Sequence, residues 1–425
     1  MKKILFSSLC FCSLLFGQPH KDSPPFAPRI PFETEVISIP RIDSSYTVYY
    51  TYKIPYALLV FERQNDSYMA NFRIIVEIND ENGKLVTRNI KDNKITVNNF
   101  EATNERHDYL QDCISFITQP GDYKVSAIIS DMNSSGERPL KPFDIHLKKE
   151  DEKLVLQPLV IEPRVVKCNE KNSFILANSG GNIPFSVEEF NLMIPLKDTS
   201  ITHIDITLTN NEEEIYSGNI SESFDESMGI TDCEGNIAIT QLPENDLTRN
   251  FVLKNINEKL NEGKVILNVK NEEKDIDEKI PLMVVWFNKP FSLLNPEKAI
   301  EYLNFIETED VVDELLSADE SDYPKVLHDY WEKYDPTPET SFNEIMFEYY
   351  SRVDYALKEF SSISNKNGAK TDRGMVYIKF GEPDKIDRTS NSLGEVIEIW
   401  TYTKSQRQFT FIDKIGTGNF TLSEN

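Results

Sequence analysis

The rhythm of apolar residues changes once along this 425-residue chain, and that change constrains its fold more than any other feature. Upstream of Asn288, short runs rich in Val, Ile, Tyr and Phe alternate with turn residues, a pattern typical of β-strands. Downstream, apolar residues recur every three or four positions, as on one face of an α-helix. The chain is therefore predicted to be multidomain, β-rich first and α+β at its end.

Two β-type regions precede this change. Residues 33–148 contain TVYYTYKI, YALLVFE, FRIIVEI, CISFIT and YKVSAIIS, and residues 154–290 contain HIDITLT, NIAITQ, KVILNVK and PLMVVWF. Turn-forming segments such as NDENGK separate the runs, and the charged segment KKEDEK marks a boundary at 148–153. Short strands at this spacing, with no helical period, indicate two tandem immunoglobulin-like β-sandwiches.

The last part, residues 295–425, is predicted to be an α+β domain. Asn295 followed by proline is typical of a helix start. Ser341 with Glu344 forms a capping-box pattern at the start of a long amphipathic helix. The runs MVYIKF, EVIEIWTY and QFTFID then predict an antiparallel meander, with Trp400 packed against the long helix.

The first residues predict export. MKK followed by ILFSSLCFCSLLFG has the charge, length and small end residue of a signal peptide, which we expect to be residues 1–17, cleaved before Gln18. Cys10 and Cys12 lack the small-residue context of a lipoprotein signal. Residues 18–32 are rich in proline and predict an extended leader. No later apolar run is long enough to span a membrane, so no transmembrane segment is expected in the mature chain.

The charge balance is strongly acidic. Loss of the signal peptide leaves 43 of the 45 basic residues against 70 acidic ones, a net charge of about −27. This disfavours nucleic acid and anionic membrane surfaces, because both require a basic patch. Cys113, Cys168 and Cys233 are too few and too scattered to predict a disulfide framework.

The most specific motif is NGAKTDRGMVYIKFGEPDKI, residues 367–386, which we interpret as a polar turn, an alternating strand and a second turn. It resembles the core motif of the GWxTD-domain family, found in envelope-type proteins of Bacteroidetes-like bacteria. The flanking segments DPTPETSFNEIMFEYYSRVDYA, EIWTY and FIDKIGTGNFTL are similar as well, so the resemblance covers about residues 295–425. Ala369 stands where the family has Trp, so a role that needs an aromatic surface there is not carried over.

The resemblance implies a family but no activity, since the family has no established biochemical function. The matched residues outside the predicted strand are the candidate binding loops: Gly368, Thr371, Asp372, Arg373, Gly374, Gly381, Pro383 and Asp384. One interpretation is structural, with Arg373 clamping a turn. The other places both turns on one face, where Arg373 and Asp384 contact a partner; Arg373→Ala would then weaken partner capture with little loss of stability.

Two functions remain as hypotheses. The first is an exported, non-catalytic interaction or structural protein of the cell envelope, in the periplasm rather than on the outer surface, with an unidentified protein partner. The alternative is a hydrolase acting on envelope peptide or glycan through Asp372 and Asp384. A strand of six to seven residues would hold these two about 20 Å apart, which is too far for glycosidase geometry unless the loops fold back. No catalytic residue is assigned.

No cofactor and no metal is expected. The five histidines show no metal-ligand spacing and are scattered along the chain: His20, His107, His146, His203 and His328. The acidic run at 310–322 is interpreted as a solvated helix face rather than a cation site.

Overall fold

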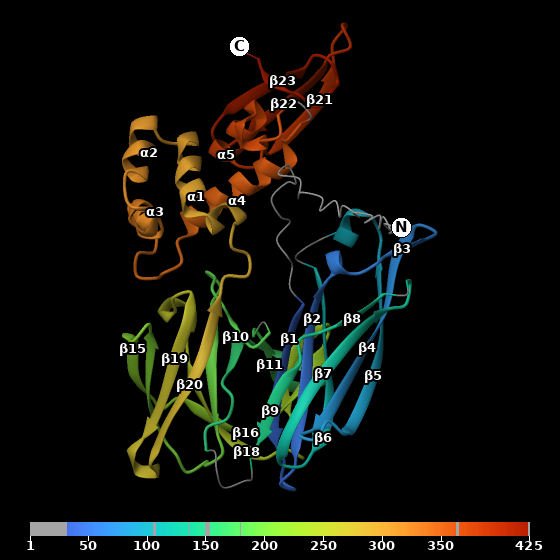
Figure 1. Cartoon of the computed structure of the whole chain (residues 1–425), viewed down its shortest axis with the longest axis vertical. Coiled ribbons are helices and arrows are strands. Elements are labelled where there is room, and N and C mark those ends of the chain that lie inside the picture. The colour runs from blue at the N-terminus through green and yellow to red at the C-terminus, as the bar shows by residue number, and fades with distance from the viewer. Residues whose placement is uncertain are drawn as a thin grey trace, which may run out of the picture.

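The computed structural model describes residues 32–104, 108–134, 136–148, 154–178, 180–362 and 365–423. The predicted signal peptide, nearly all of the leader and most of the charged boundary lie outside these ranges. Two β-rich regions stand side by side, and a group of helices with a smaller sheet lies at one end of them (Figure 1). The predicted order, β-rich first and α+β last, is confirmed.

The first β-rich region consists of two sheets packed face to face. One sheet contains β1 (Glu33–Pro40), β2 (Tyr46–Pro55) and β6 (Tyr109–Thr118). The other contains β3 (Glu62–Gln64), β4 (Ser67–Asp80), β5 (Leu85–Val97), β7 (Gly121–Asp131), β8 (Glu137–Pro139) and β9 (Phe143–Leu147). Alternate residues of β2 and β4, among them Tyr50 and Ile74, meet in a shared apolar core. The run YALLVFE is not the strand we predicted, since Tyr56–Leu58 form a 3-10 turn.

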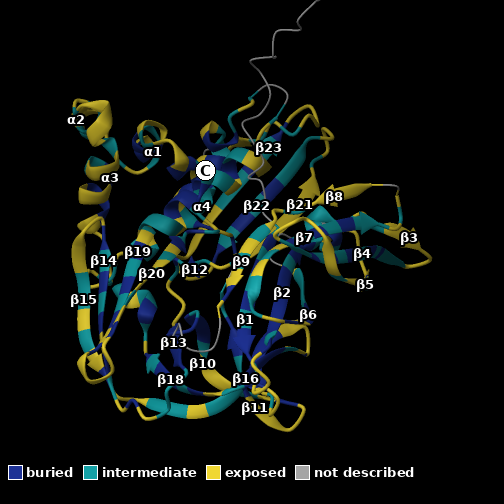
Figure 2. Cartoon of the chain, turned by 60° about the horizontal axis from the view of Figure 1, so that its bottom comes forward, coloured by how far each residue is buried: buried dark blue, intermediate teal, exposed yellow. Residues whose placement is uncertain are grey.

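The sheet of β1, β2 and β6 is buried on its second face as well. Ile37, Ile39 and Tyr49 point away from the first core and pack against apolar residues of the second region, including Met193 and Ile230. Six consecutive residues in the middle of β2 are therefore buried, and Figure 2 shows β1 and β2 in the buried colour. The two β-rich regions thus share a continuous apolar interface.

The second β-rich region contains a closed barrel, which the strand rhythm alone did not predict, and a five-stranded sheet. The barrel consists of β10 (Leu159–Cys168), β11 (Lys171–Leu176), β17 (Asn236–Gln241), β16 (Ser223–Cys233), β18 (Leu247–Leu253) and β13 (Asn191–Leu196). The sheet consists of β12 (Ile183–Pro184), β20 (Ile276–Val285), β19 (Gly263–Asn271), β14 (Ile204–Asn210) and β15 (Glu213–Ile220).

The C-terminal part has five α-helices in its described residues and a four-stranded sheet. The helices are α1 (Pro296–Tyr302), α2 (Glu309–Leu316), α3 (Tyr323–Glu332), α4 (Glu344–Glu359) and α5 (Asp372–Phe380), with a 3-10 turn η8 (Gly368–Lys370) before α5. The sheet order is β21 (Lys385–Ser390), β22 (Val396–Tyr402), β23 (Arg407–Asp413) and β24 (Thr421–Leu422). Tyr349 and Tyr350 of α4 donate hydrogen bonds to carbonyls of α1, at Tyr302 and Ala299.

The helix starts show one correct and one wrong prediction. The Asn295 side chain caps α1 by accepting a hydrogen bond from the Lys298 amide, as expected. The cap of α4 is Asn343, whose side chain accepts from the Met346 amide at 2.8 Å, and not Ser341. Asparagine is as good a cap as serine, and the Ser341 hydroxyl instead contacts Asn261.

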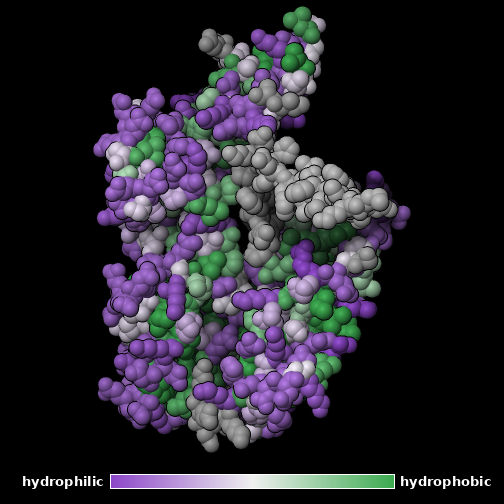
Figure 3. All heavy atoms as spheres, viewed as in Figure 1, coloured by the Kyte–Doolittle hydropathy of each residue, from purple (hydrophilic) through white to green (hydrophobic). Residues whose placement is uncertain are grey.

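The core of the second β-rich region continues into the helices. Trp286, just after β20, makes an edge-on contact with Phe185 at 5.4 Å between ring centroids and with Phe342 at 5.3 Å. These rings belong to one apolar cluster that extends from the five-stranded sheet to α4. The surface over α1–α3 is mostly hydrophilic (Figure 3). Within the described ranges, no helix has the length and apolar character needed to cross a bilayer.

Candidate functional site

The motif segment forms a helix, so the predicted alternating strand is wrong. Residues Asp372–Phe380 make up α5. Thr371 caps it, since its hydroxyl accepts a hydrogen bond from the Gly374 amide at 3.1 Å and donates one to the Gly368 carbonyl at 2.7 Å. Gly381 ends it with a φ of 77°, a conformation that glycine adopts without strain. Both predicted turns are therefore helix caps.

Two motif glycines are required by close backbone packing. A Cβ on Gly374 would lie 2.0 Å from the Gly368 carbonyl oxygen, and one on Gly368 would lie 2.1 Å from the carbonyl oxygen of Ala356 in α4. Ala369, between them, is 0 % exposed. The first turn of α5, the η8 turn and α4 thus pack backbone against backbone, where a larger residue would force them apart.

Arg373 lies in a buried polar centre between α5 and the sheet. Its Nη1 contacts Glu398 Oε2 at 3.2 Å, and only 11 % of the Arg373 side chain and 2 % of the Glu398 side chain are exposed. Trp400 Nε1 donates to Glu398 Oε1 at 3.0 Å, and the guanidinium lies 4.1 Å from the Phe420 ring centroid. Burial lowers the pKa of Arg373, while the charge of Glu398 opposes that shift. Each charged group is thus satisfied by neighbours in the fold.

Asp413 extends this centre into the loop after β23. Its carboxylate accepts hydrogen bonds from the amides of Gly418, at 2.6 Å, and Ile415, at 3.3 Å. Burial opposes ionisation, but the backbone donors outweigh it and lower the pKa of Asp413. The carbonyl of Gly418 in turn accepts from Arg373 Nη2 at 3.4 Å. A chain of polar contacts therefore fixes this loop against α5.

Asp372 is the first residue of α5 and Asp384 lies just beyond its last residue, and the two carboxylates bind different backbone groups. Asp372 Oδ2 accepts from the Leu422 amide at 2.7 Å, and Asp384 Oδ2 accepts from the Thr403 amide at 2.6 Å. A nine-residue helix spans about 13 Å, so the first and last motif residues do not form one compact face. The two carboxylates thus connect the segment around α5 to β24 and to the turn that follows β22.

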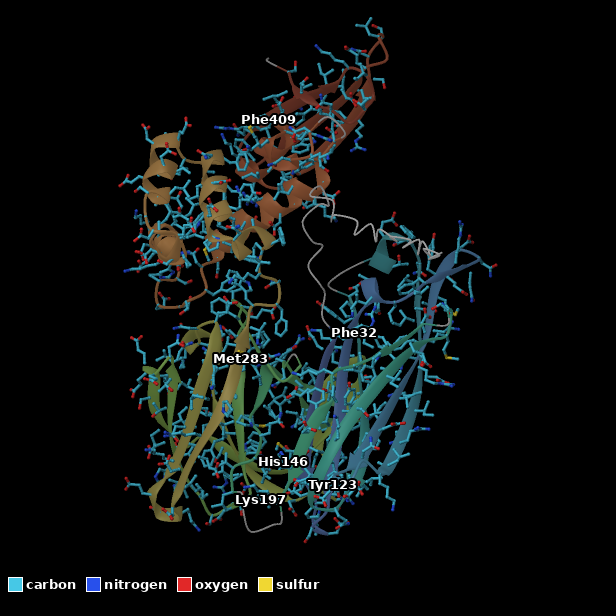
Figure 4. The ribbon with its side chains drawn as sticks, in the orientation of Figure 1. Phe32, Tyr123, His146, Lys197, Met283 and Phe409 are labelled. Carbon is cyan, nitrogen blue, oxygen red and sulfur yellow. The ribbon has the colours of Figure 1, made fainter. Side chains whose placement is uncertain are left out.

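The remaining matched residues support the same junction. Pro383 is buried, and the Gly381 carbonyl accepts a hydrogen bond from the Tyr402 hydroxyl at 2.9 Å. The ring centroid of Phe380, at the end of α5, is 5.0 Å from that of Phe409 on β23. Figure 4 shows Phe409 in this C-terminal part, well away from Met283 in the second β-rich region. The structure therefore brings all eight matched residues to the helix–sheet junction, while their binding role remains a prediction.

Sequence reasoning missed Glu398 and Asp413. The sequence contains a signal for both: each stands two residues from a buried aromatic residue of its own strand, Trp400 for Glu398 and Phe411 for Asp413. A carboxylate in such a register indicates a buried partner, because an unpaired buried charge is costly.

Two pockets lie outside the C-terminal part. One, of about 300 Å³, opens between the two β-rich regions and is lined by Glu33, Lys53, Tyr109 and Glu162, among others. The other, of about 200 Å³, lies beside Phe32 in the first region. Both are lined by mixed polar and apolar groups.

The described histidines are dispersed. His146 Nδ1 lies 2.7 Å from Asp122 on paired strands of the first β-rich region (Figure 4). His328, Asp329 and Glu332 offer ligand atoms within 4.8 Å of one another, all exposed on α3. Exposed acidic groups on one helix are common without a bound ion, so this cluster carries no functional argument.

Comparison with known proteins identifies only the C-terminal part. The GWxTD domain model matches residues 269–424. The match begins within β19, upstream of residue 295, and therefore includes β20 together with every α-helix described above and the C-terminal sheet. No curated protein matches the chain.

Proposed function

Because residues 269–424 form a GWxTD domain, we propose that the chain is an exported, non-catalytic interaction protein of the bacterial cell envelope. Its place would be the periplasm, and the C-terminal domain would recognise a protein partner. The first β-rich region, which we propose is an immunoglobulin-like sandwich, and the second, with its closed barrel, would act as a rigid spacer. Export is supported by the signal-peptide pattern of residues 1–17.

The observation that carries this proposal is the face of the C-terminal sheet that points away from α5. Trp400 and Phe411 point to the side covered by α5 and the end of α4. Because side chains alternate along a strand, the neighbours of these two rings point to the opposite side. That side, called the open sheet face, consists of half-buried residues: Ile397, Ile399, Thr401, Thr410 and Ile412.

The open sheet face has the character of a protein-binding surface. Ile397 pairs with Ile412 across β22 and β23, and Ile399 pairs with Thr410, so apolar and hydroxyl groups are contiguous. Among the described residues, these isoleucines belong to none of the apolar core clusters. A contiguous, partly accessible apolar patch is more typical of an interaction site than of a solvated face.

The open sheet face is a better candidate for the contact surface than the charged motif residues. Arg373 is occupied by Glu398, so the predicted contact of Arg373 with a partner would require that ion pair to break. The alternative of a hydrolase gains no support, because Asp372 and Asp384 each accept a backbone hydrogen bond at opposite ends of the helix. Paired catalytic carboxylates need a separation of about 5–10 Å across one substrate.

The test is capture of partners from a cross-linked envelope fraction with matched surface variants. Ile399→Lys with Ile412→Lys alters the open sheet face, and Ile117→Lys on β6, a 61 % exposed position, is the control. We expect partners bound by the wild-type chain to be lost only with the first variant, provided that both variants unfold at the wild-type temperature. Equal capture by both variants would refute the role of this face.

Export is tested separately. The periplasmic fraction should contain a chain that begins at Gln18, as determined by N-terminal sequencing. A chain that keeps residues 1–17 and stays with the cytoplasm would refute the location without affecting the capture result.

A further inference from the structure

Two cysteines that are distant in sequence occupy equivalent positions in the barrel. Cys168 is the last residue of β10 and Cys233 is the last residue of β16. Each precedes a two-residue turn to the next strand, since Cys168 pairs with Lys171 and Cys233 pairs with Asn236. The turn residues of both hairpins have positive φ, as tight β-hairpin turns require. The backbone around each thiol is therefore fixed by its own hairpin.

The two thiols face each other. Cys168 Sγ lies 3.7 Å from the carbonyl oxygen of Asp232, the residue before Cys233. Reciprocally, Cys233 Sγ lies 3.9 Å from the carbonyl oxygen of Lys167, the residue before Cys168. Cys168 also contributes to raising the pKa of the Cys233 thiol, as expected of two sulfurs that lie close together. Both are about 5 % exposed, within a small apolar cluster that includes Ile175 and Ala238.

We propose that Cys168 and Cys233 form a disulfide that joins the β10–β11 hairpin to the β16–β17 hairpin when the chain folds in an oxidising medium. The pair is free in this structure, but its mutual contact is what a bond would need. The proposal goes beyond the interaction function. Its occurrence in the cell rests on the proposed export, because oxidising compartments preserve disulfides.

The bond would form by exchange with a disulfide donor, either a small molecule such as oxidised glutathione or a thiol–disulfide oxidoreductase. The thiolate of one cysteine attacks the donor disulfide, forms a mixed disulfide and releases the first donor thiol. The second cysteine then attacks the sulfur of the first, which closes the Cys168–Cys233 bond and releases the second donor thiol. Two electrons and the two cysteine protons end on the donor.

This exchange belongs to folding rather than to the finished protein. In the folded state both sulfurs are buried, and burial together with the contact to Cys168 raises the pKa of the Cys233 thiol to about 11. Because the thiolate is the reacting species, a native dithiol would react slowly with a donor. During folding the thiols are solvated, and the hairpins then bring them together.

Cys113 is the natural competitor and control. It lies on β6, is half-buried, and is close enough to Asp232 for that carboxylate to contribute to raising its pKa, after burial and Asp112. A non-specific oxidation would therefore engage Cys113 as readily as the buried pair.

The test is oxidative refolding of the full chain with Cys10→Ser and Cys12→Ser, so that three cysteines remain. The chain is unfolded under reducing conditions, refolded in a glutathione redox buffer, alkylated and mapped by peptide mass spectrometry. We expect a linked peptide pair containing Cys168 and Cys233, an intact mass lower by two hydrogens, and an alkylated Cys113.

Two variants serve as controls for the identity of the linked cysteines. Adding Cys113→Ser should leave the linked pair unchanged, and adding Cys168→Ser should abolish it. Folded chain in which all three thiols are alkylated, or in which Cys113 is linked to either barrel cysteine, would overturn the proposal. Because the wild-type pair is read directly by mass, failure of a variant to fold does not affect the outcome. The refolding buffer supplies the oxidant, so the result is independent of export.

Discussion

Replacement of Glu35 by Gln should stabilise the protein at alkaline pH. Glu35 lies on β1, where it is 3 % exposed at the junction between the two β-rich regions. Its carboxylate accepts hydrogen bonds from Gln157 Nε2 at 2.9 Å and from the backbone of Gly181. Burial outweighs these donors and raises the pKa of Glu35 from 4.5 to about 7. Within the described residues, no cation contributes to this shift of the Glu35 pKa.

The raised pKa of Glu35 determines how the stability of the protein changes with pH, and by how much. A folded pKa above the unfolded one means that the folded chain binds the proton more tightly, so the stability is full below pH 4.5 and is lost as the pH rises through 7. At about 1.4 kcal/mol for each pH unit, the loss approaches roughly 3 kcal/mol above pH 8. Glutamine keeps the shape and the acceptor oxygen without the charge.

Urea unfolding of the wild type and Glu35→Gln between pH 5 and pH 8 measures this effect. We expect the variant's advantage to grow by about 2 kcal/mol over that range. Glu62→Gln, at an exposed position of β3, is the control and should change stability by less than about 0.5 kcal/mol. If the extra stability of Glu35→Gln did not vary with pH, the inference that Glu35 binds a proton in the folded protein would be refuted.

Three further predictions concern the helix–sheet junction. Arg373→Ala should lower the free energy of unfolding by about 3–5 kcal/mol, because it removes the buried partner of Glu398 and leaves that carboxylate only the 3.6 Å ion pair with the exposed Arg388. Arg388→Ala, at a side chain 70 % exposed, should cost far less in the same urea titration, and equal losses would contradict the burial argument. Trp400→Ala should cost about 3–5 kcal/mol, since Trp400 is 1 % exposed; a loss below about 1 kcal/mol would show that the ring is dispensable. Gly374→Ala should abolish or severely reduce folding as followed by circular dichroism, and wild-type melting would mean that the backbones separate at little cost.

The sequence predicted the helix–sheet junction in outline because its elements are long and periodic. It did not distinguish the ends of α5 from the turns of a hairpin, since threonine and glycine, here Thr371 and Gly381, occur both at helix ends and in β-turns. The burial of α5 explains why apolar residues alternate with others in MVYIKF. The helix packs on two sides, so only Met375 and Lys379 are exposed, and those two lie four residues apart on one helical stripe.

In the β-rich part most of the predicted runs are strands, YALLVFE being an exception, but their assembly was not predictable. The strand TVYYTYKI has apolar and aromatic side chains on one face, whereas the other carries Tyr49 among threonines and a lysine. This pattern indicated a strand without saying what covers its second face. The covering residues, such as Met193 and Ile230, come from strands far along the chain, and nothing local specifies that contact. The closed barrel depends on the same long-range pairing.

The two-faced sheet of β1, β2 and β6 sets an order of events during synthesis. When Leu147 has been added, the first β-rich region has all of its strands, yet Ile37, Ile39 and Tyr49 still lack the barrel residues that cover them. The last of those residues, Ile239, follows after a delay of about 5–20 s at a rate of roughly 5–20 residues per second. For that interval the nascent chain exposes an apolar sheet face. Either a chaperone must cover this face, or the first region must stay unfolded until the barrel residues follow.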